Sequence, residues 1–74
     1  MPKLKDKALH IKIGTRIQEI RKEKKLEQQD LAANCAYDKS YLSRIESGKT
    51  DARISTYSKI AEGLGVELSE LFNF

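Results

Sequence analysis

The residues best suited to chemistry lie between positions 38 and 47, where polar and apolar side chains alternate with the period of a helix. Leu42 and Ile45 are three residues apart and therefore share one face of that helix. The opposite face carries four donor-rich side chains: Lys39, Ser40, Ser43 and Arg44. A compact face of this kind suits the major groove of duplex DNA, where base edges present hydrogen-bond acceptors. Arg44 could donate two parallel bonds to a guanine.

Enzymatic chemistry finds little support. His10 is the only histidine, and its place near the N-terminus predicts an exposed side chain. No His, Cys or carboxylate residues have the spacing of a metal site, and no glycine-rich phosphate loop is present. We therefore expect no enzyme, no metal, no cofactor and no small-molecule substrate.

Helices are predicted along the whole domain. Apolar residues recur at helical spacing from Leu9 to Ile20, and this first helix should fade near positions 24–25. Further helices fit 28–34, 38–47, 54–63 and 68–72, with Asp38 as an N-cap and Gly48 as a stop. The sequence thus predicts an all-α fold of five short helices over residues 9–74, preceded by a basic flexible tail at residues 1–8.

The second and third helices should pack steeply across a short turn. Ala32 is small enough for the two backbones to approach closely there. Leu31, Leu42 and Ile45 would then be buried between them. This packing would lock the apolar side of the third helix inward and leave its polar side exposed.

Length and composition set further limits. The chain has 74 residues, a net charge of +3 and a single cysteine, Cys35, so no internal disulfide can form. Up to Lys25 it holds nine basic residues against three acidic ones, which favours a polyanionic partner. There is no apolar signal stretch and no membrane-length apolar run. We expect a cytoplasmic protein that does not bind membranes, in which Cys35 packs as a small hydrophobe.

Three motifs in the chain resemble one known family. They are a QxxLA opening at Gln28, an IExGK segment at Ile45, and an LGVxLxELF tail at Leu64. This pattern resembles the helix-turn-helix family that includes the lambdoid phage repressors and the controller proteins of restriction–modification systems. The resemblance implies a lambda-repressor-like DNA-binding domain. It also implies a transcriptional regulator that binds a palindromic operator in double-stranded DNA as a homodimer.

The resemblance also implies residue roles. Lys39, Ser40 and Arg44 match positions that reach base edges, and Ser43 lies near the same face. Arg21 and Glu46 match a partly buried structural salt bridge. Contacts to DNA phosphates are expected from a set at the helix ends and the following loop: Gln28, Tyr41, Ser47, Lys49, Thr50 and Arg53. For Tyr41, contact with a thymine methyl instead of the backbone is also open, and packing alone remains an equal alternative.

Three positions depart from the family pattern without removing a DNA-contacting group. Ala36 stands where a glycine with positive φ is usual, which should cost on the order of 1 kcal/mol. Glu27 is a weaker cap than the usual Thr or Ser, and Ala52 replaces a loop proline. These departures should lower the stability of the monomer.

The C-terminal segment is the expected dimer surface. Its candidates are Val66, Leu68, Phe72 and Phe74, with Tyr57 as a further candidate, whereas Leu71 should belong to the core. Alternative functions with the same fold are an antitoxin or another protein-interaction module, because fold alone does not fix function. Whether the protein represses or activates, and whether it is a restriction–modification controller, stays open at this point.

Overall fold

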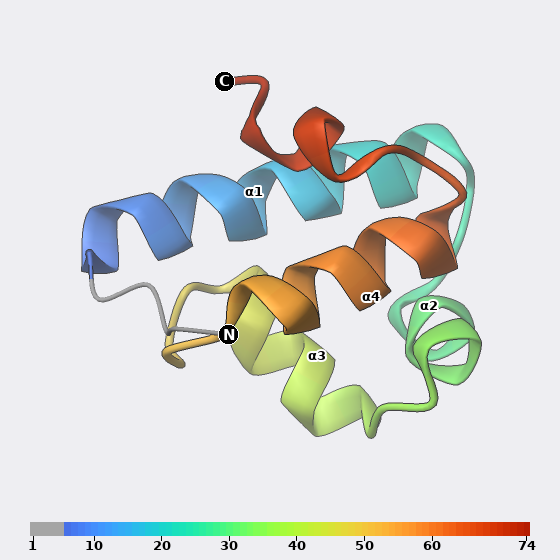
Figure 1. Cartoon of the computed structure of the whole chain (residues 1–74). Helices are drawn as coiled ribbons and strands as arrows, with labels where there is room; N and C mark the ends of the chain where they lie inside the picture. Colours follow the sequence, from blue (N-terminus) through green and yellow to red (C-terminus); the bar gives the residue numbers. More distant parts are fainter. Residues whose placement is uncertain (1–5) are drawn as a thin grey trace.

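The computed structural model describes residues 6–74, and the N-terminal residues 1–5 of the predicted tail lie outside the described residues. Four α-helices and a 3-10 helix follow one another along the chain (Figure 1). They are α1 (Lys7–Glu23), α2 (Gln28–Cys35), α3 (Lys39–Glu46), α4 (Ile54–Leu64) and η1 (Leu68–Phe72). The predicted all-α architecture is therefore confirmed.

Helix α1 begins two residues earlier than its apolar pattern suggested. The Asp6 carboxylate accepts hydrogen bonds from the backbone N–H groups of Ala8 (3.0 Å) and Leu9 (3.3 Å), which caps the helix. Lys7 and Ala8, assigned to the tail from sequence, thus belong to α1. The chain leaves α1 through Lys25, which adopts a left-handed conformation at φ 59°.

The turn between α2 and α3 contains the positive φ expected at Ala36. Ala36 is left-handed at φ 59°, where its Cβ costs roughly 1–2 kcal/mol. Glu27 is the N-cap residue of α2, and the Asp30 carboxylate in the first turn accepts a hydrogen bond from its backbone N–H at 3.0 Å. Asp38 occupies the N-cap position of α3, but its side chain makes no capping hydrogen bond.

The helices enclose one apolar core. Helix α3 packs against α1 and α2, and α4 packs against α2 and η1. Leu71 is fully buried, as predicted. Tyr57 is also fully buried, so its assignment to the dimer surface is wrong. It lies on the inward face of α4 with Ile60, Ala61 and Leu64, and no part of it is available to a partner.

Close approach of α1 to the end of α3 depends on Gly14. A Cβ at this position would lie 2.5 Å from the Glu46 carbonyl oxygen and 2.6 Å from that of Ile45. Both atoms are backbone, so only glycine lets the two helices meet there. This contact fixes the position of α3 relative to the rest of the domain.

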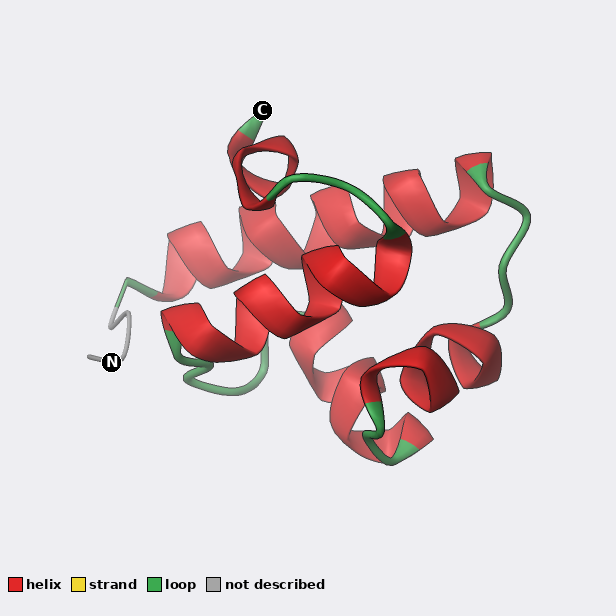
Figure 2. Cartoon of the chain, turned by 45° about the vertical axis from the view of Figure 1, so that its right-hand side comes forward, coloured by secondary structure: helices red, strands yellow, loops and turns green. Residues whose placement is uncertain are grey.

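The helices α2 and α3 and the C-terminal segment lie on opposite sides of the molecule. In Figures 1 and 2, α2 and α3 lie on one side, and η1 with the C-terminus lies on the other side, beyond α1 and α4. Within residues 6–74, the structure contains no helix with the length and apolar character of a membrane span.

Candidate nucleic-acid interface

The outer face of α3 is exposed, and its inner face is locked into the core. Leu42 and Ile45 have no accessible surface. On the other side, all four predicted base-contacting side chains are exposed: Lys39, Ser40, Ser43 and Arg44. The structure therefore brings this set together on one free helix face.

A buried ion pair anchors the end of α3 to α1. The Arg21 guanidinium donates from Nε to Glu46 Oε2 at 2.9 Å and from Nη2 to Glu46 Oε1 at 3.2 Å. Its Nη1 donates to the Leu26 carbonyl at 2.8 Å. Glu46 is only 2% exposed and Arg21 only 9%. This forked geometry suits a structural clamp, because a guanidinium and a carboxylate match in shape and charge.

Gln28 joins the same network from the first turn of α2. Its Nε2 donates to Glu46 Oε1 at 3.0 Å, and the side chain is half-buried. A side-chain amide carries two N–H groups, so a second donor remains beside the N-terminus of α2. Gln28 and Lys39 also line one hollow, which connects the beginnings of α2 and α3.

The loop from Ser47 to Arg53 follows α3 and presents two exposed cations, Lys49 and Arg53. Thr50 is half-buried. The Ser47 hydroxyl donates to the carbonyls of Ser43 (3.0 Å) and Arg44 (3.1 Å), so it already serves to cap α3. A phosphate contact from this hydroxyl would have to compete with those bonds.

His10 is buried beneath the loop from Ser47 to Arg53, contrary to the prediction that it is exposed. It is 1% exposed, and its Nδ1 forms a 2.6 Å hydrogen bond with the Tyr57 hydroxyl. Its Nε2 lies 3.8 Å from Asp51 Oδ1. The prediction was wrong because it rested on the nearness of His10 to the N-terminus, whereas His10 lies on the inward face of α1, one turn before Ile13. Its spacing from Ile13 and Ile17 was the available signal.

The buried phenol of Tyr57 predicts that the protein loses stability at alkaline pH. Burial raises the pKa of Tyr57 from 10.0 to about 12. Folding then favours the protonated phenol, so its contribution is complete below pH 10 and is lost as pH rises toward 12. The loss should be on the order of 2 kcal/mol in the free energy of unfolding.

Urea unfolding between pH 9 and 12 tests this contribution. Tyr57→Phe lacks the His10 bond at every pH, but its stability should fall less steeply over this range than that of the wild type. Equal slopes for Tyr57→Phe and the wild type would contradict the assignment.

Cys35 is fully buried, and its Sγ lies 3.7 Å from the Lys59 carbonyl oxygen. Burial raises the pKa of the Cys35 thiol, so the less reactive protonated form prevails. This agrees with the expected role as a small hydrophobe. Residues 6–74 contain no cluster of three or more His, Cys, Asp or Glu side chains suited to a metal ion.

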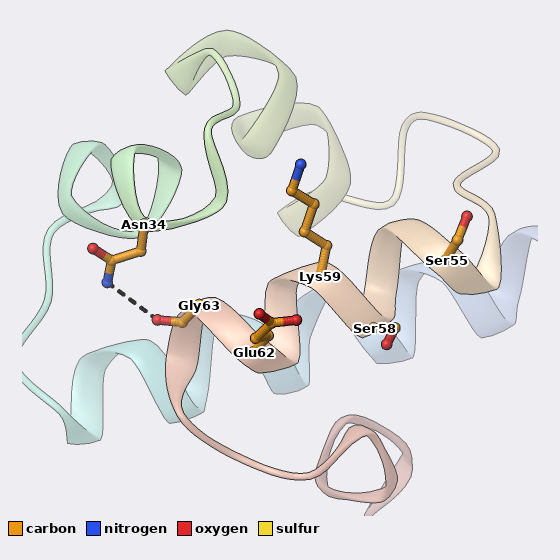
Figure 3. A pocket seen from close by; sticks show the side chains of 6 residues that line it. All are labelled: Asn34, Ser55, Ser58, Lys59, Glu62 and Gly63. Carbon is orange, nitrogen blue, oxygen red and sulfur yellow. Dashed lines mark hydrogen bonds between the residues drawn. The ribbon is translucent and has the colours of Figure 1, made fainter.

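A polar hollow between α2 and α4 was not anticipated from the sequence. It has a volume of about 600 Å³ and is lined by Asn34, Ser55, Ser58, Lys59, Glu62 and Gly63 (Figure 3). Asn34 Nδ2 donates to the Gly63 carbonyl at 3.1 Å and ties the two helices together. None of the predicted DNA-contacting residues lines it.

The predicted dimer residues lie around the C-terminal end. Val66, Leu68 and Phe72 are half-buried, whereas Phe74 is 59% exposed. Ile11, which the sequence analysis did not select, is 45% exposed and lines one hollow with Phe74. It lies on the outward side of α1, two residues before the buried Ile13.

Comparison with known proteins gives consistent matches. Residues 17–71 match the helix-turn-helix family model. The control protein C.MunI from Mycoplasma sp is 41% identical over 66 residues, which cover 88% of this chain and 89% of that protein. The immunity repressor of Bacillus phage phi105 is 39% identical over 59 residues, covering 80% of this chain and 41% of the repressor.

Solved structures show the same similarity. The restriction–modification controller C.AhdI from Aeromonas hydrophila superposes with a TM-score of 0.84 at 35% identity, covering 88% of this chain and 98% of that one. The controller C.Esp1396I, solved as a tetramer in complex with its natural 35 base-pair operator, gives a TM-score of 0.81 at 34% identity, covering 86% of this chain and 84% of that one.

Proposed function

We propose that this chain, which belongs to the helix-turn-helix family and is a transcriptional regulator of that type, binds an inverted-repeat operator as a homodimer. One observation carries this proposal: the polar face of α3 is exposed while Leu42 and Ile45 hold the opposite face in the core. A helix anchored in this way can enter the major groove without rearrangement.

Direct base readout is assigned to the outer face of α3. Arg44 lies in the last turn of α3 and would pair with guanine O6 and N7. Lys39 and Ser40 lie in the first turn and would reach neighbouring base edges, and Ser43 would contribute from the same face. Each good bidentate pair contributes roughly 1–3 kcal/mol of discrimination between bases.

Contacts to the phosphate backbone would fix the register on either side of α3. Gln28 would contribute from the N-terminus of α2, where the helix dipole favours an anion. Lys49 and Arg53 supply exposed positive charge on the loop after α3. The remaining phosphate candidates are Tyr41, Ser47 and Thr50. Such contacts position the protein but carry no sequence information directly.

Dimerisation is assigned to the C-terminal end, through Val66, Leu68, Phe72 and Phe74. This end lies across the molecule from α2 and α3 (Figure 2). A partner bound there would therefore leave α3 of each protomer uncovered. A two-fold dimer would read half-sites about 34 Å apart, one turn of DNA. Similarity to C.MunI and C.AhdI over most of their lengths supports a role as a restriction–modification controller.

Selection of bound duplexes from a random pool tests this function. The wild-type protein should enrich an inverted repeat whose halves are related by two-fold symmetry. Lys49→Ala should weaken binding to all duplexes about equally. It should also reduce the slope of log binding constant against log salt concentration by roughly one for each half-site. A protein that retains no duplex at low salt would contradict the proposal, and a single unrepeated site would contradict the homodimer.

The dimer surface can be tested separately by sedimentation. Phe72→Asp should shift the protein to a monomer, because a charge would replace half-buried apolar surface at the proposed interface. Ser69→Asp adds the same charge at an exposed position of η1 and should remain dimeric. A folded Phe72→Asp variant that still sediments as a dimer would place the interface elsewhere.

A further inference from the structure

Two tyrosine rings connect the helix-turn-helix turn to α3. Tyr37 precedes α3, and Tyr41 lies in its first turn. Their ring centroids are 5.1 Å apart with an interplanar angle of 86°, an edge-to-face arrangement. Such pairs are favourable because the positive edge of one ring meets the negative face of the other. Both rings are half-buried, which limits their freedom to rotate.

A cation lies over each of these rings. Lys59 Nζ is 5.1 Å from the Tyr37 ring centroid, and Arg44 Cζ is 5.8 Å from that of Tyr41. Figure 3 shows the Lys59 side chain extending from α4 on the side where α2 and α3 lie. The order is thus Lys59, Tyr37, Tyr41, Arg44, and it leads from α4 to the outer face of α3. We call these four residues the cation–aromatic stack.

The cation–aromatic stack restrains a side chain that would otherwise be mobile. Arg44 is exposed, and within residues 6–74 its guanidinium makes no hydrogen bond or salt bridge. Its ring contact with Tyr41 therefore limits the rotamers from which binding must start. Tyr41 is in turn held by its edge-to-face contact with Tyr37 in the turn, and Tyr41 and Arg44 are neighbours on the surface of α3 because they are three residues apart.

We propose that Tyr37 is a positioning residue for base readout, which acts through Tyr41 to hold the Arg44 guanidinium in the orientation that meets a base edge. The proposal rests on the proposed function and deepens it. It gives sequence specificity a contribution from a residue in the turn, outside the exposed face of α3. A restrained arginine loses less conformational freedom on binding, so it favours the matched duplex selectively.

Variants at Tyr37 test the proposal through the specificity ratio, the Kd for an unrelated duplex divided by the Kd for the selected duplex. Tyr37→Leu removes the ring and should lower this ratio about threefold, the size expected for loss of an exposed cation–aromatic restraint. Tyr37→Phe keeps the ring and should stay within about twofold of the wild type on the same scale. Tyr37→Met is a second ring-free variant if the leucine fails to fold.

A double-mutant cycle separates positioning from a loss of folding. In an Arg44→Ala background, Tyr37→Leu should leave the specificity ratio unchanged, because the group that it positions is gone. A merely structural effect would weaken matched and unrelated duplexes alike and would persist in that background. That result, or an unchanged ratio in a folded Tyr37→Leu protein, would overturn the proposal.

A measurement without DNA keeps this test independent of the proposed function. Nitrogen relaxation of the Arg44 Nε–H group should show greater fast motion in Tyr37→Leu than in the wild type or Tyr37→Phe. Equal order in all three proteins would overturn the positioning role even if DNA binding is confirmed. Conversely, wild-type protein that binds no duplex would contradict the proposed function, while the relaxation data would still decide whether Tyr37 restrains Arg44.

Discussion

Replacing Glu46 with alanine is expected to lower the free energy of unfolding by about 3–5 kcal/mol, the range for breaking one side of a buried ion pair. The variant would leave the Arg21 guanidinium nearly buried without its carboxylate. It would also remove the acceptor of the Gln28 amide. A 74-residue domain has a total stability of roughly 4–11 kcal/mol, so the variant would lose a large share of it.

Urea unfolding followed by helical circular dichroism measures this loss. Glu46→Gln is the matched control: it keeps the shape and one acceptor oxygen, and should lose less stability than Glu46→Ala. The double variant Arg21→Met with Glu46→Leu should be more stable than Glu46→Ala alone, because it leaves no buried charge unpaired. A loss below about 1 kcal/mol for Glu46→Ala would mean that the pair behaves like an exposed one.

The second large effect is expected from Gly14→Ala. At an ordinary interior helix position, alanine is more favourable than glycine by roughly 0.5–1 kcal/mol. Here the new Cβ would lie 2.5 Å from the Glu46 carbonyl oxygen, and a backbone atom cannot rotate away. Gly14→Ala should therefore destabilise the protein instead of stabilising it, and lower the free energy of unfolding by about 1–3 kcal/mol through overpacking.

Thr15→Ala, the next residue along α1 and exposed, is the control for this substitution and should be close to neutral. Affinity for the selected duplex should fall in Gly14→Ala even at temperatures where the protein is folded, because α1 would push the end of α3. A Gly14→Ala protein as stable as the wild type would show that α1 and α3 are not held at this distance.

The periodicity of the sequence was sufficient to predict the helix that matters most. Leu42 and Ile45 identified the inner face of α3 because helical period alone decides which side chains share a face. Ala36 was expected to have positive φ, and it does. Arg21 and Glu46 were paired through the family resemblance, since nothing local links residues 25 positions apart.

What the sequence analysis missed concerns which polar side chains are buried and how closely the helices pack. His10 was misplaced because its nearness to the N-terminus was weighed above its helical spacing from Ile13 and Ile17, which share its buried face. Tyr57 was misassigned because a tyrosine suits both a core and an interface. The contact at Gly14 is a tertiary property: a glycine within a helical pattern does not reveal which backbone it faces.

The most direct test of the central claim, that the outer face of α3 reads base edges in DNA, is to repeat the duplex selection with Arg44→Ala. The account predicts that preference is lost at one base pair in each half-site, by roughly 1–3 kcal/mol, while the rest of the enriched repeat is retained. Enrichment of the same motif by the wild type and a folded Arg44→Ala variant, with undiminished preference at every position, would contradict it.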